Sequence, residues 1–201
     1  MLGPSLVVAI GAIVAIAATL VGGTMQERLN RNRADFIGRR EHLRSRHQAR
    51  IDQMQAASAE RHVAWTMLSV AQATDESQDG TIIPTRGIAG TRMAQAVVAA
   101  VGTIYGENGP EDVNRYITDN QLPPVIEAAR QGHIGAIGTL NQTYERLYES
   151  WANDNNNVVN MISQLNTDIA QIDMKLIRTR YTANALQIIG LVIALFRDFT
   201  A

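Results

Sequence analysis

The first 26 residues of the chain contain no charged side chain, and this feature limits most strongly what the protein can fold into. Residues 6–21 read LVVAIGAIVAIAATLV, and about 20 apolar residues are enough to cross a bilayer as a helix. A cleaved signal peptide is the competing interpretation, but such peptides begin with basic residues, and the opening MLGPS has none. We therefore expect residues 1–25 to form an N-terminal transmembrane helix that is not removed.

A second apolar segment lies near the other end, where residues 183–196 read ANALQIIGLVIALF. The segment has only 14 residues and includes Asn184 and Gln187, so it is marginal as an independent span. With Tyr181, Thr182 and Phe199 at its borders, it can still cross along a thin or tilted path. The alternatives are a buried core helix and a half-inserted interfacial helix. We expect residues 183–201 to form a C-terminal transmembrane or membrane-inserted helix with a short tail.

The charges are distributed unevenly although the formal net charge is only −1, which argues against a globally basic nucleic-acid binder. Residues 26–50 hold eight arginines and three acidic residues, whereas residues 51–174 hold six arginines and fifteen acidic residues. Cations flank the inner ends of both apolar segments, and only Arg197 lies beyond them. The positive-inside rule then places residues 26–182 in the cytoplasm and both termini across an inner or cytoplasmic membrane. The cations expected at the lipid headgroups are Arg28, Arg31, Arg33, Lys175, Arg178 and Arg180.

Helical periodicity dominates the rest of the chain, and no sustained alternation typical of strands occurs. Leu29, Phe36 and Leu43 recur every seven residues, which is typical of a helix with a narrow packing stripe. A longer stripe alternates steps of four and three residues, as in a coiled coil. This seam consists of Val158, Ile162, Leu165, Ile169, Ile172 and Leu176, and continued in phase it reaches Ala183, Leu186, Gly190 and Ile193.

These patterns predict an all-α fold: a membrane-anchored, long antiparallel helical hairpin or coiled-coil stalk with a small helical head. Residues 26–74 form the Arg-rich first stalk arm, residues 75–152 the head with its loops, and residues 153–182 the second arm. Within the head, a loop is expected over residues 75–92, followed by helices from about 91 to 105, 110 to 119 and 123 to 132, and from 134 onward. The run NDNNN at residues 153–157 predicts a turn or distortion.

Small residues in the first apolar segment predict a packing face inside the membrane. Gly11, Ala15, Ala18 and Gly22 are spaced by four, three and four residues, so they form a ridge that allows another helix to approach closely. The helix that packs there is the second apolar segment, another copy of the chain or another subunit.

The residues that usually carry chemistry form no convincing site. The chain has no Cys, which excludes disulfides and thiolate ligands, and His42, His47, His62 and His133 follow no metal-ligand spacing. Glu145 and Glu149 are expected on a solvated helix face, and no phosphate-binding loop occurs. We therefore predict no catalytic, cofactor-binding or metal-binding residue, and a protein that is not an enzyme.

The sequence thus predicts a two-span membrane scaffold, or an accessory subunit of a larger membrane assembly, that acts through helix packing. Its expected partners are membrane lipids and other membrane-protein subunits or copies of itself, and not nucleic acid. Two alternatives remain open. A span, a helical region and a second span resemble the layout of bacterial chemoreceptor input modules, which implies a helical sensor. A component of an envelope, a virion or a secretion apparatus would have the same sequence features.

Overall fold

The computed structural model describes residues 4–75 and 82–195, and all the elements in these two stretches are helical, which confirms an all-α fold. The long α1 (Pro4–Asp75) comes first, and α2 (Ile82–Tyr105) follows it. A short 3-10 helix, η1 (Gly106–Asn108), precedes α3 (Pro110–Asp119) and α4 (Leu122–Arg130). The last helix is α5 (Ile134–Leu195). The chain divides into two compact units: unit 1 contains Met1–Leu43 and Asn160–Ala201, and unit 2 contains Arg44–Val159.

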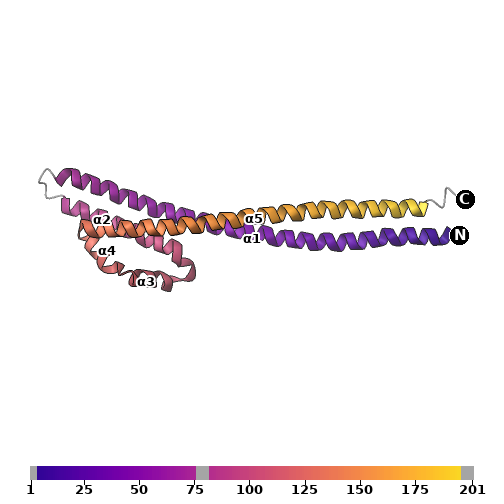
Figure 1. Ribbon diagram of the computed structural model, residues 1–201, viewed down its shortest axis with the longest axis horizontal. Helices are drawn as coiled ribbons and strands as arrows, with labels where there is room; N and C mark the ends of the chain where they lie inside the picture. Colours follow the sequence, from indigo (N-terminus) through magenta and orange to yellow (C-terminus); the bar gives the residue numbers. More distant parts are fainter. Residues whose placement is uncertain (1–3, 76–81, 196–201) are drawn as a thin grey trace. The chain divides into compact units, whose positions relative to one another are not determined.

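Unit 1 is built from the first part of α1 and the last part of α5, which lie side by side (Figure 1). As the residue number increases along α1, the number of the contacting residue on α5 decreases. Gly11 meets Gly190, Gly22 meets Ala183, Arg33 meets Asp173, and Arg40 meets Asn166. The two segments are therefore antiparallel within this unit.

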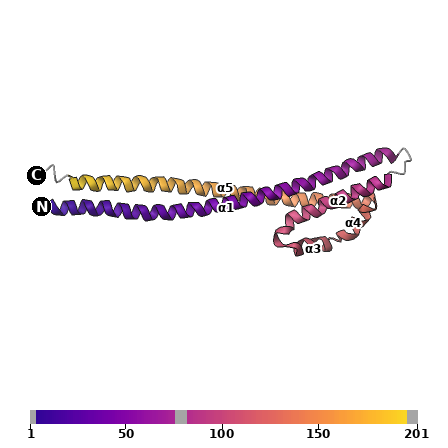
Figure 2. The same cartoon turned by 180° about the vertical axis from the view of Figure 1, so that it is seen from behind.

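Unit 2 encloses a core of large apolar side chains to which four of its helices contribute. The second half of α1 and the first part of α5 pack here with α2 and α4, while α3 packs beside α2 and α4 (Figure 2). The buried residues of α2 and α5 fall mostly at spacings of three and four, as expected for an amphipathic helix. The main buried residues are Met54 and Leu68 of α1, Met93, Val97 and Val101 of α2, Leu122 of α4, and Ile137, Leu140, Tyr144 and Leu147 of α5.

The loop predicted over residues 75–92 is too long, because α2 already begins at Ile82. Residues 76–81 lie outside the described part of the chain. Pro84 falls in the first turn of α2, where a helix does not use the backbone N–H that proline lacks. A Cβ on Gly87 would lie 2.7 Å from the carbonyl oxygen of Arg130, and one on Gly90 would lie 1.8 Å from that of Ala129. These glycines thus mark the close packing of α2 on α4, and not a loop.

The turn predicted at residues 153–157 is wrong, because α5 continues through these residues without a break. Asn and Asp have low intrinsic helix propensity, but tertiary packing overrides propensity. Four of the five side chains are exposed, while Trp151 and Val158 on either side are half-buried. The packing of the flanking residues is sufficient to keep the segment helical.

The helix ends elsewhere agree with the sequence signals. Pro110 opens α3 with Glu111 and Asp112 in its first turn, as predicted. Gln121, at φ 51°, adopts the left-handed conformation just before α4. The α1 helix ends at Asp75, next to the predicted end of the first stalk arm at residue 74.

The boundary between the two units falls inside the two segments that the sequence presented as stalk arms. Residues 26–43 belong to unit 1, but residues 44–74 belong to unit 2 and supply part of its core. In the same way, residues 153–159 belong to unit 2 and residues 160–182 to unit 1. Unit 2 is therefore larger than the head predicted over residues 75–152.

Candidate functional site

The small-residue ridge of α1 faces α5 in unit 1. Gly11, Ala18 and Gly22 are buried and Ala15 is half-buried, while the residues between them are mostly exposed. A Cβ on Gly11 would lie 2.6 Å from the carbonyl oxygen of Gly190 and 2.9 Å from the amide nitrogen of Ala194. The two backbones meet so closely that neither glycine leaves room for a side chain.

The heptad seam of α5 is less exposed than its neighbours along its whole length. In unit 1, Ile169 and Ile172 are buried, and Ile162, Leu165 and Leu176 are half-buried. Val158, the remaining seam residue, belongs to unit 2 and is half-buried there. Opposite the seam, Leu29, Phe36 and Leu43 of α1 are half-buried as well.

The predicted continuation of the seam needs a correction at Leu186, whereas Ala183 and Ile193 are half-buried as predicted. Leu186 is exposed, and the half-buried position beside it is Gln187, whose Nε2 donates a 2.7 Å hydrogen bond to Oγ1 of Thr19. A straight helix drifts against a strict seven-residue repeat, so the contact line moves to the next residue. Gly190 is buried as the seam requires.

Most of the basic residues near the apolar segments are exposed. Arg28 and Arg31 are exposed on α1, and Lys175, Arg178 and Arg180 are exposed on α5. Arg33 differs from them, because it is half-buried in the packing line and its Nε donates a 2.6 Å hydrogen bond to Oδ1 of Asp173. The sequence did not reveal this pair, which requires the register of the two helices.

The polar-to-apolar boundaries of the two helices lie at the same level in unit 1. Gly22 is in contact with Ala183, and a groove of about 300 Å³ includes both Met25 and Arg178 in its lining. Beyond this level, the described part of neither helix carries a charged side chain. Two segments about 160 positions apart in the sequence therefore form one charge-free end of the unit.

This charge-free end exposes large apolar side chains. Ile13 is 64% exposed, and other large apolar side chains of the two helices are similarly exposed. The exposed set on α1 is Ile10, Ile13, Ile16, Leu20, Val21 and Met25, and on α5 it is Leu186, Ile188, Ile189, Leu191, Val192 and Leu195. Large exposed apolar patches are typical of surfaces that contact a membrane or another protein.

Two described helices, α1 and α2, are long and apolar enough to cross a membrane. They differ in burial, because only 17% of the apolar stretch of α1 is buried, compared with 50% of the apolar stretch of α2. Half-burial is typical of a core helix, and α2 indeed supplies Met93 and Val97 to the core of unit 2. The described residues of the predicted C-terminal span do not form a stretch that is as long and as apolar as those of α1 and α2.

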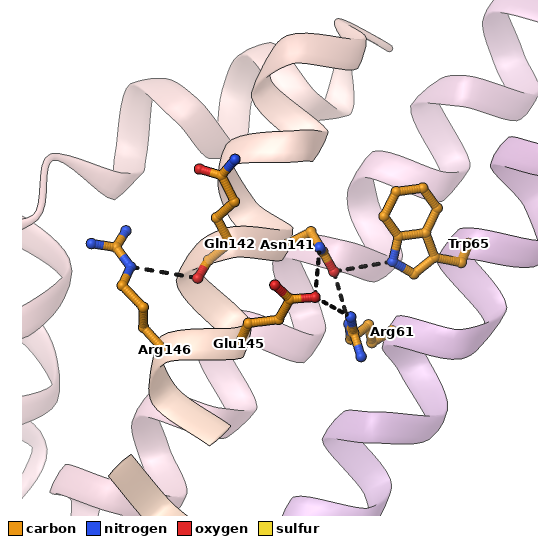
Figure 3. A network of polar contacts seen from close by, with 6 residues as sticks. All are labelled: Arg61, Trp65, Asn141, Gln142, Glu145 and Arg146. Atoms are coloured by element: carbon orange, nitrogen blue, oxygen red, sulfur yellow. Dashed lines mark hydrogen bonds and ion pairs between the residues drawn. The ribbon is translucent and has the colours of Figure 1, made fainter. Parts of the chain in front are cut away.

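A polar network joins α1 and α5 in unit 2 (Figure 3). Asn141 Oδ1 accepts hydrogen bonds from Arg61 Nε at 2.8 Å and from Trp65 Nε1 at 3.0 Å. Glu145 Oε1 accepts from Arg61 Nη2 at 2.7 Å. Glu145 is exposed, as predicted from the sequence, and it is also paired with Arg61 across the two helices.

The same arginine lies over the ring of Tyr144, with its guanidinium carbon 5.2 Å from the ring centroid. Burial raises the pKa of Tyr144 above its usual value, while a hydrogen bond with Ser58 and the charge of Arg61 act in the opposite direction. The network joins α1 to α5 within unit 2. Among the residues described, no three His, Asp or Glu side chains are grouped to hold a metal ion.

Comparisons with family models, with curated proteins and with solved structures found no match to this chain. The function therefore has to be argued from the two units themselves. The candidate site is the α1–α5 packing face of unit 1 together with its charge-free apolar end.

Proposed function

We propose that the protein is a two-span integral membrane protein in which α1 and the end of α5 cross the bilayer as an antiparallel pair. The observation that carries the proposal is the charge-free end of unit 1, where apolar side chains are exposed on both helices at the same level. Water does not stabilise such a surface, whereas lipid does. Residues 7–25 of α1 would extend for about 28 Å, close to the hydrocarbon thickness of a bilayer.

The C-terminal segment reaches the membrane with the help of α1. Alone it is short, but its contact with α1 at Gly190 and the hydrogen bond between Gln187 and Thr19 reduce the polar surface that it presents to lipid. The two helices therefore insert into the membrane together. The packing of the seam residues continues from the membrane toward Leu43 and Ile162.

The exposed basic residues at the boundary support the proposed orientation. Arg28, Arg178 and Arg180 lie where the anionic headgroups of a cytoplasmic leaflet would be, and each cation near such a surface gains about 1 kcal/mol. Unit 2 would then lie in the cytoplasm of an inner or cytoplasmic membrane, with both termini on the other side.

Within this orientation, we propose a non-enzymatic scaffold or accessory subunit that acts through helix–helix packing. Its distinctive surfaces are packing faces: the glycine contact between α1 and α5, and the exposed apolar side chains that remain around it. Its partners would be lipids and other membrane subunits or further copies of the chain.

Purification of the full chain from native membranes in a mild detergent tests this function. Size analysis and mass spectrometry of everything retained should give either a fixed set of membrane proteins in stoichiometric amounts or a homo-oligomer. The matched variants are Gly11→Leu, whose side chain would meet α5, and Gly23→Leu, which has open space around it. The assembly should be lost or reduced only in Gly11→Leu.

A chain that purifies as a monomer without stoichiometric partners would contradict the scaffold function. Equal loss of the assembly in both glycine variants would contradict the role of the α1–α5 packing face.

A further inference from the structure

A groove of about 300 Å³ runs along unit 1 where the polar and apolar parts of α1 and α5 meet. Its smallest lining residues are Gly22, which is buried, and Ala183, which is half-buried and in contact with Gly22. Larger and exposed side chains stand beside them. We refer to the groove as the boundary groove, and its larger lining residues include Val21 and Met25 of α1 and Arg178, Thr182 and Leu186 of α5.

The lining of the boundary groove changes from apolar to polar in the same direction along both helices. Ala18 and Leu186 lie at its apolar end, among the residues of the charge-free end of the unit. Met25 and Arg178 lie at its polar end, about 10 Å further along the two helices. The boundary groove therefore has the amphipathic character of a lipid, with one polar end and one apolar end.

Two hydroxyl groups lie between these ends. Thr179 and Thr182 line the groove, and their hydroxyls form no hydrogen bond with another residue in the described part of the chain. Thr19 and Thr24 differ, because each of their hydroxyls donates to a carbonyl oxygen four residues earlier in α1. The groove thus offers two hydroxyl donors that the helix itself does not use.

Three cations lie at the polar end. Arg178 belongs to the lining, Arg28 follows Met25 by three residues on the same side of α1, and Lys175 precedes Arg178 by three residues on the same side of α5. All three are exposed, and none of them forms an ion pair with a residue that the structure describes. Arg180 lies on a different side, because two residues correspond to about 160° around the helix from Arg178.

The acidic residues at this level point to other sides of the helices and are already paired. Glu27 is two residues from Met25, or about 160° around α1, and it forms an ion pair with Arg31. Asp173 is likewise two residues from Lys175, and it is paired with an arginine of α1. Neither carboxylate therefore neutralises the three cations.

The next acidic residues lie further from the boundary groove. Asp35 follows Arg28 by seven residues, and Asp168 precedes Lys175 by seven residues, so each is about 10 Å further along its helix. Asp35 forms an ion pair with Arg39. The polar end of the groove therefore carries a local excess of positive charge that is open to an anion.

An anionic phospholipid has the chemistry that fits both ends. Its phosphate accepts hydrogen bonds from a guanidinium group and from hydroxyl groups, and its acyl chain is apolar. A free phosphate would leave the apolar end of the groove uncovered. A zwitterionic phospholipid would bring its own ammonium group close to the three cations, which is less favourable than a headgroup with a net negative charge.

We propose that the boundary groove binds one anionic phospholipid from the leaflet that contains these cations. The phosphate lies against Arg178 and the hydroxyls of Thr179 and Thr182, and one acyl chain extends toward Ala18 and Leu186. This inference rests on the proposed function, because a lipid of that leaflet reaches the groove only when both helices are inserted in a membrane.

Native mass spectrometry of the full chain in mild detergent tests the proposal. The probes are phosphatidylglycerol, phosphatidylcholine with the same acyl chains, and glycerol 3-phosphate, which carries a phosphate without acyl chains. Each copy of the chain should retain one phosphatidylglycerol and bind phosphatidylcholine several-fold more weakly. Glycerol 3-phosphate at the same concentration should not displace the bound lipid.

Replacement of the cations tests the polar end of the groove. Arg178→Gln should weaken phosphatidylglycerol binding by about 5-fold, as expected for the loss of one cation beside an anionic headgroup. The matched control is Arg180→Gln, which removes the same charge two residues away and should have clearly less effect. Arg178 is exposed, so its replacement leaves the packing of α1 on α5 intact. Arg178→Lys should retain most of the binding, because lysine also binds phosphate.

Replacement of the hydroxyls tests the contact with the phosphate separately. Thr182→Val should weaken phosphatidylglycerol binding by roughly 2- to 10-fold, as expected for the loss of one hydrogen bond. Thr24→Val is the control, because the hydroxyl of Thr24 is bonded within its own helix, and this change should leave the binding unaltered.

Equal retention of the two phospholipids, displacement by glycerol 3-phosphate, or equal effects of Arg178→Gln and Arg180→Gln would each overturn the proposal. Alkaline carbonate extraction of native membranes separates this result from the proposed function. A chain that is extracted contradicts the proposed function, whereas a chain that stays in the membrane but shows no preference for phosphatidylglycerol contradicts only this inference.

Discussion

The two units bury opposite kinds of side chain. Unit 2 encloses Met93, Leu140 and Tyr144 and exposes mainly polar residues, as a domain that folds in water does. At its charge-free end, unit 1 buries Gly11 and Gly190 and exposes large residues such as Ile13 and Leu20. The same two helices, α1 and α5, contribute to both units. Under the proposed function, this difference means that one pair of helices is packed for lipid in unit 1 and for water in unit 2.

Both units nevertheless use glycine for the closest contact between their helices. Gly90 lets α2 meet the backbone of α4 in unit 2, and Gly11 lets α1 meet that of α5 in unit 1. In water such a contact adds to a core of large side chains, but in lipid, where apolar burial offers no gain, close packing is itself the main attraction. The comparison can therefore be tested by substitutions in both units.

The largest expected effect is in the core of unit 2. Leu140 is fully buried, so Leu140→Ala should lower the free energy of unfolding of unit 2 by about 2–5 kcal/mol, through lost apolar contacts and the cavity left behind. Val98→Ala, at an exposed position, should change it by less than about 0.5 kcal/mol. Denaturant unfolding of the full chain in mild detergent measures both. Equal effects would contradict the view that unit 2 has a core of the kind found in water-soluble domains.

The glycine contact in unit 2 should come next. A Cβ at Gly90 would lie 1.8 Å from the carbonyl oxygen of Ala129, so Gly90→Ala forces α2 and α4 apart and should cost about 1–3 kcal/mol. Gly102, also in α2, has open space around it, and Gly102→Ala should instead stabilise the helix by about 0.4–1 kcal/mol. Thermal unfolding should thus move in opposite directions, and a shift of the same sign would contradict the close contact.

The matching contact in unit 1 should respond more weakly, because in the proposed membrane-embedded pair the two helices can separate slightly in fluid lipid. Gly11→Ala should weaken the α1–α5 pair by about 1–2 kcal/mol, while Gly23→Ala, in open space, should have little effect. Disulfide formation within one chain between Thr19→Cys and Gln187→Cys, which are hydrogen-bonded partners in the native chain, reports the pairing. If Gly23→Ala reduced that disulfide as much as Gly11→Ala did, the assigned packing face would be wrong.

The smallest expected effect concerns the ion pair between Arg33 and Asp173. Both side chains are about 40% exposed, so solvent screens the pair and its contribution should be about 0.2–1 kcal/mol. A double-mutant cycle with Arg33→Ala and Asp173→Ala measures it through the same disulfide, and added salt should reduce it. A coupling well above this range would show that the pair lies in a drier environment than its exposure indicates.

The all-α fold, the ridge from Gly11 to Gly22 and the seam from Val158 to Leu176 could all be predicted from periodicity, because spacings of three and four residues determine which side chains share a helix face. Features that depend on a partner helix could not. Gly87 and Gly90 resembled loop residues until the backbone of α4 was placed beside them. Likewise, Glu145 has Arg146 next to it in the sequence, but the fold brings it to Arg61.

Accessibility of single cysteines in native membranes tests the central claim most directly. In this structure Ile13 is 64% exposed and Leu20 is 63% exposed, both more than Val98 in unit 2, which is 41% exposed. In membranes opened so that an aqueous maleimide reaches both faces, we predict that Val98→Cys reacts and that Ile13→Cys and Leu20→Cys do not until the membrane is dissolved and the chain unfolded. Reaction of Ile13→Cys and Leu20→Cys as fast as Val98→Cys would show that water covers this end of unit 1, and would contradict the account.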